Sequence, residues 1–140
     1  MSTINVHREY DADPEELWEL VATSEGLAEW LMPNDFAPVV GHRFTFTDTP
    51  RPPFYDGLVG CEVLELDPPR LLTISWAGGP VDTVVTFRLV PLGSGRTRLE
   101  LTHTGFSGLK AGIVRAILGL GWSRLLRRHI PRALAAHRGA

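Results

Sequence analysis

The sequence predicts an α+β fold, in which one curved antiparallel sheet holds a long helix against its inner face. Three observations predict it. An alternating segment and two helical segments open the chain, a run of period-two segments with short turns fills its middle, and helical spacing returns only after Gly108. Because consecutive strands with short connections pair with their neighbours, the middle of the chain is expected to form a meander. A chain of 140 residues fits one domain, spanning 1–140.

The first elements carry clear start signals. Ile4 to Tyr10 contains the alternation typical of a strand. A helix is expected to begin at Pro14, because Asp13 can cap its N-terminus and proline is favoured at the first helical position. This helix is expected to end near residue 23. A second short helix is expected over residues 25–31, because a proline follows closely.

Further strands are expected between residues 39 and 103, separated by the turn sequences DPPR, AGGP and GSG. The segment TPRPPF, residues 49–54, is a proline-rich loop. Tyr55 follows this loop and could lie at the rim of a pocket or in an ordinary turn. Alternation places a set of mostly large side chains on the inward faces: Phe44, Phe46, Leu72, Ile74, Trp76, Val85, Phe87, Leu89, Leu99, Leu101 and His103.

The last twenty residues contain five arginines and no acid, and their spacing predicts an amphipathic helix from about Gly121 to His137. One arc of this helix collects apolar residues and two histidines: Leu118, Trp122, Leu125, Leu126, His129, Ile130, Ala133 and His137. Most of the arginines fall on the opposite side. Pro131 removes one internal hydrogen bond and is expected to bend the helix.

The segment before this helix differs in character. Arg115 is out of phase with the apolar arc, so a break is expected at Gly119 and Gly121, after a separate short helix over residues 109–118. That short helix is apolar on nearly all sides and needs cover from the sheet, a second subunit or the mouth of a ligand site. A homodimer through residues 109–120 is therefore one expectation.

Charge is spread unevenly along the chain. All 16 acidic residues lie before residue 101 with 7 basic ones, whereas 7 basic residues and no acid lie after it. Such a pattern could serve an outside polyanion, or could let two parts of one fold attract each other. The arginines lack the exposed aromatic residues typical of nucleic-acid binding, and the apolar arc is needed to cover the sheet. Neither nucleic acid nor a membrane is therefore expected as a partner, and the single Cys61 fits a cytoplasmic protein.

Six segments carry a family resemblance: REYDADPEELWELV (8–21), EGLAEWLMP (25–33), GHRFTF (41–46), GCEVLELDPPRLLTISW (60–76), VTFRLVPLGSGRTRLELTHTGF (85–106) and GWSRLLRRHIPRALA (121–135). Together they resemble the SRPBCC superfamily, and within it the small bacterial homologues of the C-terminal domain of heat-shock-protein-90 ATPase activators. The resemblance implies the helix-grip fold of START domains and the birch pollen allergen, with a cavity between the sheet and the C-terminal helix. It also implies an apolar or aromatic ligand there, such as a lipid or a polyketide.

The candidate cavity residues are those expected on inward faces: Trp30, Phe44, Phe46, Trp76, Phe87, His103, Trp122, Leu126 and His129. The aromatic rings could equally form an ordinary core. His103 and His129 are either hydrogen-bonded core histidines or a donor and acceptor for one ligand, with acid–base chemistry as an option. The sequence contains no recognisable metal motif, nucleotide-binding loop or catalytic signature, so no cofactor is expected.

Three functions from different classes stay open. The preferred one is binding of an apolar or aromatic small molecule without chemistry. A cyclase or dehydratase acting in the same cavity would need polar groups that move protons. A protein-interaction module, which the resemblance to chaperone activators suggests, would need a sizeable exposed patch, and residues 109–120 are the candidate.

Overall fold

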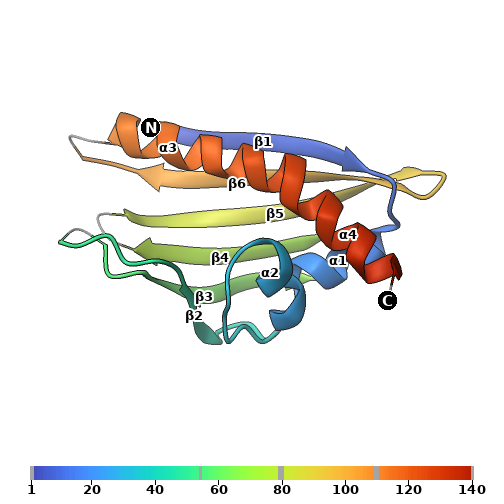
Figure 1. The fold of residues 1–140 in the computed structure, drawn as a ribbon, viewed down its shortest axis with the longest axis horizontal. Coiled ribbons are helices and arrows are strands. Elements are labelled where there is room, and N and C mark those ends of the chain that lie inside the picture. Colours follow the sequence, from blue (N-terminus) through green and yellow to red (C-terminus); the bar gives the residue numbers. More distant parts are fainter. Residues whose placement is uncertain (1, 54, 79–80, 109–110, 140) are drawn as a thin grey trace.

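The computed structural model describes residues 2–53, 55–78, 81–108 and 111–139. It confirms the predicted α+β helix-grip architecture, in which a six-stranded antiparallel sheet curves around a long C-terminal helix (Figure 1). The elements in chain order are β1 (Ser2–Tyr10), α1 (Pro14–Val21), α2 (Ser24–Trp30), β2 (Arg43–Thr47), β3 (Leu58–Asp67), β4 (Leu71–Gly78), β5 (Val81–Gly93), β6 (Arg96–Phe106), α3 (Ala111–Arg124), the π-helical turn η1 (Leu125–His129) and α4 (Ile130–Gly139).

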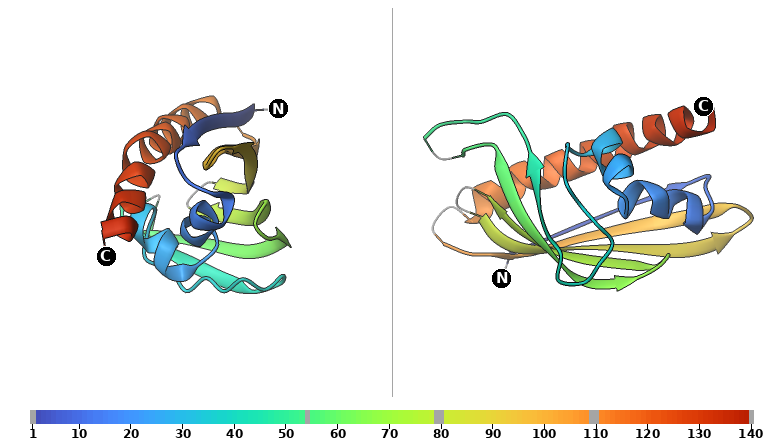
Figure 2. Two further views of the ribbon diagram at one scale, coloured as in Figure 1. Left: turned by 90° about the vertical axis from the view of Figure 1, so that its right-hand side faces the viewer. Right: turned by 90° about the horizontal axis from the view of Figure 1, so that it is seen from below.

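The sheet is a meander of β2 to β6, with β1 added beside β6. The strand order is β1-β6-β5-β4-β3-β2. The first strand therefore forms one edge of the sheet, and the chain then crosses to the other edge, where β2 starts the meander that returns to β1. All neighbouring strands are antiparallel, and Ile4 of β1 lies opposite His103 of β6. The end-on view in Figure 2 shows the strands curling around one side of the helix. The curvature leaves a concave face that the helices must cover.

The helices divide this concave face into two regions. At the packed end, α1 contacts β5, β6 and α4, while α2 contacts α4 and η1. At the open end, α3 lies along β1 and β6 without either short helix beneath it (Figure 1). Large apolar side chains fill the packed end, and the Trp30 indole N–H there donates to the backbone oxygen of Leu20 at 2.7 Å. The Tyr10 hydroxyl ties β1 to η1 by donating to the backbone oxygen of Leu126 at 2.6 Å.

The predicted break at Gly119 and Gly121 is wrong. Helix α3 runs through both glycines, because an internal glycine costs a helix only about 1 kcal/mol and packing along β1 outweighs that cost. Residues 109 and 110 of the predicted short helix lie outside the described part of the chain. The irregularity comes later, at η1, directly before Pro131. Proline lacks an N–H and its ring crowds the carbonyl four residues earlier, and the turn widens so that the Ile130 N–H bonds to the oxygen of Leu125.

The amphipathic character of the last helix is otherwise as predicted. Trp122, Leu126, Ile130 and Ala133 are buried, whereas the arginines of the opposite side are exposed. The widened turn takes up an extra residue and rotates the helical residues after it. Leu134 is consequently buried, while His137, which was predicted to face inward, is exposed near the end of the helix.

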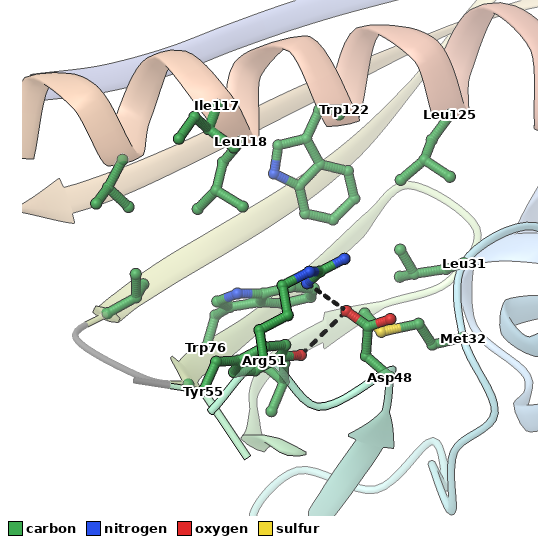
Figure 3. Close-up of a pocket in the computed structure, with 15 residues that line it drawn as sticks. Leu31, Met32, Asp48, Arg51, Tyr55, Trp76, Ile117, Leu118, Trp122 and Leu125 are labelled. Carbon is green, nitrogen blue, oxygen red and sulfur yellow. Dashed lines mark hydrogen bonds and ion pairs between the residues drawn. The ribbon is translucent and has the colours of Figure 1, made fainter. Parts of the chain in front are cut away.

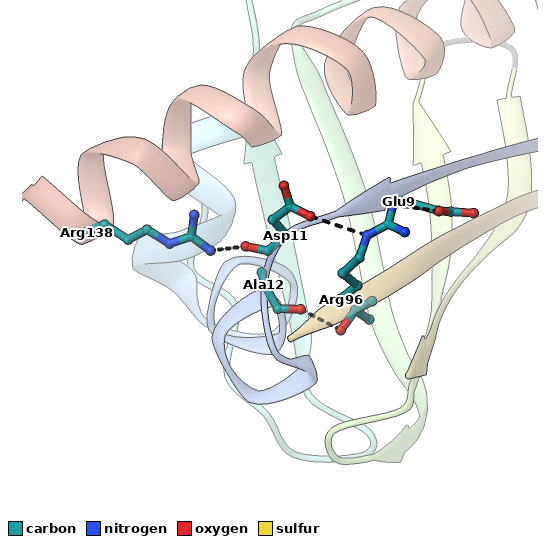
Figure 4. Close-up of polar contacts among 6 residues, drawn as sticks. Glu9, Asp11, Ala12, Arg96 and Arg138 are labelled. Atoms are coloured by element: carbon teal, nitrogen blue, oxygen red, sulfur yellow. Dashed lines mark hydrogen bonds and ion pairs between the residues drawn. The ribbon is translucent and has the colours of Figure 1, made fainter. Parts of the chain in front are cut away.

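The oppositely charged parts of the chain form ion pairs with each other in the fold. Arg138 of α4 forms an ion pair with Glu16 of α1 at 2.8 Å and also contacts the backbone oxygen of Asp11 (Figure 4). The hydrogen bond from Arg138 lowers the pKa of Glu16. Arg96 of β6 reaches Glu9 and Asp11 in the same area. The basic C-terminal segment thus meets the acidic N-terminal part of its own chain.

Among the residues that the structure describes, no helix combines the length and apolar character needed to cross a membrane.

Candidate functional site

A pocket of about 390 Å³ lies at the open end, between α3 and the strands β3 and β4 (Figure 3). Its size falls within the range of small-molecule sites, about 300 to 1,000 Å³. The loop between β2 and β3, and the residues just after α2, complete its walls. Its walls are mostly apolar: Leu31, Met32, Val59, Trp76, Val81, Val114, Ile117, Leu118, Trp122 and Leu125.

Two indole rings make the innermost wall. Trp76 comes from β4 and Trp122 from α3, and their ring centroids are 5.3 Å apart at a tilt of 58°. Trp76 also contacts Phe46 behind it, with centroids 5.5 Å apart, so the wall continues into the core. Only small parts of both tryptophans are exposed. Rigid aromatic surfaces of this kind bind apolar or flat ligands with little loss of side-chain entropy.

A buried hydrogen-bond chain holds these two tryptophans in place. The Trp122 indole N–H donates to His103 Nδ1 at 3.0 Å, and His103 Nε2 lies 2.6 Å from Thr83 Oγ1. Thr83 Oγ1 in turn donates to the backbone oxygen of Trp76 at 3.0 Å. Because an indole nitrogen can only donate, Nδ1 must be the acceptor and Nε2 carries the proton that Thr83 accepts. Thr83 Oγ1 therefore accepts from His103 and donates to Trp76, and the direction of every hydrogen bond is consistent.

These hydrogen bonds and the burial of His103 fix its protonation state. The side chain is fully buried, and burial lowers the pKa of His103 from 6.5 to about 4. At neutral pH the ring is neutral, and both of its nitrogens are occupied by Trp122 and Thr83. His103 therefore positions the pocket wall and has no free nitrogen to offer a ligand.

The side of the pocket opposite α3 is polar. Asp48, Arg51 and Tyr55 come from the loop between β2 and β3, whose tip is closed by two backbone hydrogen bonds between Arg51 and Tyr55, at 2.7 and 3.1 Å. The Tyr55 hydroxyl donates to Asp48 Oδ2 at 3.2 Å, and Arg51 Nη1 lies 3.6 Å from the same oxygen (Figure 3). Burial, with the Asp48 carboxylate as the next cause, raises the pKa of Tyr55 to about 12, so its hydroxyl keeps its proton at neutral pH.

The nine candidate residues separate into three groups. Trp76 and Trp122 line the pocket. Trp30, Phe44, Phe46, Phe87 and Leu126 are buried in the core beside or behind it, and His103 lies directly behind Trp122. His129 is half-buried in η1 and takes no part in the hydrogen-bond chain of His103. The structure therefore does not bring the two histidines together around one ligand.

Two polar residues of the pocket had no signal in the sequence. Asp48 and Arg51 lie in or beside the proline-rich segment, where no periodicity assigns a side chain to one face. Tyr55, for which the sequence allowed either a pocket rim or an ordinary turn, lines the pocket. Among the described residues, no group of three His, Cys, Asp or Glu side chains is placed to hold a metal ion.

Gly121 gives the pocket part of its space. It lines the pocket from α3, and a Cβ atom at this position would meet no atom within 4 Å apart from its chain neighbours and the backbone of its own helix. The helix there can accept a side chain, which would project into open space.

Comparison with known proteins relates this architecture to solved structures. Protein MLL2253 from Mesorhizobium loti is 30% identical, with a TM-score of 0.82 over 96% of this chain and 98% of that chain. The Aha1 dimer from Colwellia psychrerythraea is 24% identical, with a TM-score of 0.72 over 90% of this chain and 91% of that chain. DynU16, from the dynemicin biosynthetic locus, is 23% identical, with a TM-score of 0.70 over 91% of this chain and 46% of that chain. The latter two, below 25% identity, support the fold alone.

No curated protein matches the chain. The model of the family described as "Activator of Hsp90 ATPase homolog 1-like protein", a family of the SRPBCC type, matches residues 11–135, which is most of the chain. Together with the fold, this match shows that the chain belongs to the family of activator of Hsp90 ATPase homolog 1-like proteins.

Proposed function

We propose that this protein binds an apolar or aromatic small molecule, lipid-like or polyketide-like, in the pocket between α3 and the sheet. The observation that carries the proposal is a pocket of about 390 Å³ with mostly apolar walls, in which a buried hydrogen-bond chain holds the Trp122 indole and joins it to the backbone of Trp76. A preformed apolar cavity with few polar groups is typical of small-molecule sites. Affinity there comes from burial of ligand surface, about 25 cal/mol for each Å² of apolar area.

The arrangement favours binding over catalysis. His103 is neutral and fully hydrogen-bonded, so it cannot exchange a proton with a ligand without breaking the pocket wall. Tyr55 keeps its proton at neutral pH, and Asp48 is engaged by Tyr55 and by the backbone N–H of Thr49. A cyclase-type reaction is the second candidate. It is favoured by the polar side of the pocket and by the name of DynU16, which places that protein in a biosynthetic locus.

The test fills the pocket without touching the core. N-phenyl-1-naphthylamine, a neutral probe whose fluorescence rises in apolar surroundings, is titrated into the wild-type protein and into Gly121→Leu. Wild type is expected to bind it saturably, and Gly121→Leu is expected to bind at least about tenfold more weakly, because the leucine occupies space that the probe needs.

The matched control is Gly112→Leu, on the same helix. A Cβ at Gly112 also meets no atom within 4 Å, but Gly112 does not line the pocket, so the affinity should stay at the wild-type value. Equal binding by all three proteins would mean that the probe sits elsewhere and would contradict the pocket assignment.

We propose a second feature, self-association through α3, as expected for residues 109–120. The described part of that segment exposes Ile113, Ile117 and Leu120, at 64%, 63% and 76% of their surface. Their spacing places them along one ridge of the helix. The solved Aha1 of Colwellia psychrerythraea is a dimer, which supports a search for the same state here.

Sedimentation velocity over a range of concentrations tests this feature. Wild type is expected to form a dimer, and Leu120→Glu is expected to weaken it by placing a charge on the exposed ridge. Leu92→Glu, on an exposed apolar residue of β5, is the control and should behave as wild type. A wild-type protein that remains monomeric at every concentration would contradict the interface.

A further inference from the structure

The charged and hydroxyl-bearing side chains of the pocket gather on one side of it. Asp48, Arg51 and Tyr55 all belong to the loop between β2 and β3, whereas α3 and the strands contribute apolar side chains. Figure 3 shows the Arg51 side chain extending from this loop into the pocket, between Trp122 and Tyr55. A ligand that matches both sides must have an apolar body and one polar head group.

This polar side has more unused hydrogen-bond donors than acceptors. Asp48 is engaged within the loop: Oδ1 accepts from the backbone N–H of Thr49 at 2.7 Å, and Oδ2 accepts from the Tyr55 hydroxyl at 3.2 Å. Arg51 has five N–H donors, and its contact with Asp48 among the described residues is an ion pair at 3.6 Å, beyond hydrogen-bond length. The polar side therefore has unused N–H donors, whereas each oxygen of its carboxylate already accepts a hydrogen bond.

We propose that the pocket selects an amphipathic acid, a molecule with an apolar or aromatic body and an oxyanion head group that Arg51 binds. This inference rests on the proposed function, because it assigns a head group to the ligand of the same pocket. The planar guanidinium group can donate two parallel hydrogen bonds to a carboxylate. The Arg51 side chain is 69% exposed and its guanidinium carbon lies 5.8 Å from the centroid of the Tyr55 ring, so the group can present its N–H edge to a head group while it stays beside Tyr55. The apolar body then lies against Trp76 and Trp122.

A cationic head group is less well matched. It would have to share the Asp48 carboxylate with Tyr55, Thr49 and Arg51, and it would approach Arg51, a like charge. A neutral head group could accept one bond from Arg51 but would gain no charge-assisted interaction. The order of preference is therefore acid, then neutral, then amine.

Three ten-carbon molecules with the same apolar body test this order: decanoate, decanol and decylamine. Each is titrated at pH 7.5 against the protein carrying N-phenyl-1-naphthylamine, and displacement of the probe is measured. Decanoate is expected to displace the probe at roughly tenfold lower concentration than decanol, as one hydrogen bond to a charged group implies. Decylamine is expected to be the weakest.

Arg51→Gln assigns the preference to one side chain. In this variant the advantage of decanoate over decanol, each measured against the variant's own affinity for the probe, should fall to about twofold or less. Arg43→Gln is the matched control, because Arg43 is an exposed, ion-paired arginine that does not line the pocket, and it should retain the full preference. Thermal unfolding of both variants verifies that they are folded.

The outcomes separate the two proposals. Equal displacement by the three molecules, or a preference that survives Arg51→Gln, overturns the head-group assignment and leaves the pocket in place. A preference for decylamine also overturns it and points to Asp48. Failure of the wild-type protein to bind the neutral probe at all overturns the pocket, and the head-group assignment falls with it.

Discussion

The packed end and the open end of the concave face use the same sheet and the same C-terminal helix, yet one is filled and the other is hollow. At the packed end, α1 and α2 lie between the helix and the sheet, and Trp30, at 1% exposure, fills the space beneath them. At the open end, α3 has neither short helix beneath it, and Gly121 leaves space where a side chain would project. Position relative to α1 and α2 therefore decides whether an inward ring becomes core or pocket wall.

The two ends also expose their apolar residues differently. Leu17 and Leu126, at the packed end, are completely buried, whereas Ile117 of the pocket wall is 63% exposed. A packed interior loses contacts when an atom is removed, but an open pocket has few contacts to lose. The packed end should therefore carry most of the stability and the open end most of the binding.

The largest expected effect tests this division of roles. Trp30→Ala should lower the free energy of unfolding by about 3 to 5 kcal/mol, because it opens a cavity in close-packed core and removes the donor to Leu20. Leu118→Ala, on a half-buried residue of the pocket wall, should cost only about 1 kcal/mol. Urea denaturation measures both. Similar losses would show that the open end is packed like the rest.

The next largest effect is a dependence of the free energy of unfolding on pH, caused by His103, which lies between the two ends. Between about pH 6.5 and pH 4, His103 is neutral in the folded protein but protonated in the unfolded chain. Because the unfolded state then binds more protons, the free energy of unfolding falls as the pH is lowered through this range. The full loss, reached below about pH 4, is on the order of 3 kcal/mol, at about 1.4 kcal/mol for each pKa unit.

The control for this pH dependence is His103→Gln. A glutamine amide can accept from Trp122 and donate to Thr83, but it does not titrate, so the variant should lose less stability than wild type between pH 6.5 and pH 4. Urea midpoints at several pH values give both curves. Parallel curves would show that His103 does not cause the slope.

Periodicity was enough to predict the architecture. The period-two segments became β2 to β6, and the helical spacing after Gly108 became the long helix. The predicted break at Gly119 and Gly121 was wrong, since local propensity is weaker than packing along β1. Pro131 was the better signal, because its missing N–H disturbs the helix wherever it packs.

The pocket could be predicted only in part. Alternation turned Trp76 inward and helical spacing turned Trp122 inward, but neither shows that a void lies in front of them. That void depends on where α1 and α2 pack. The role of His103 depends on Thr83, which lies twenty residues away on the paired strand β5. Contacts of this kind arise from strand register, which a single sequence indicates only weakly.

The smallest expected effect concerns the wall that separates the two ends. Trp122→Phe keeps an aromatic ring facing Trp76 but removes the indole N–H, so Nδ1 of the buried His103 loses its donor. Leaving a buried acceptor unpaired costs about 1 to 3 kcal/mol of the free energy of unfolding. Without this hydrogen bond the aromatic ring at position 122 is held less firmly, so the variant should also bind N-phenyl-1-naphthylamine less tightly. Trp18→Phe, on a half-buried indole of α1 outside this hydrogen-bond chain, is the control for the change of ring size. If Trp122→Phe and Trp18→Phe lose equal stability and Trp122→Phe keeps full probe affinity, the hydrogen-bond chain does not hold the wall, and the pocket depends on packing alone.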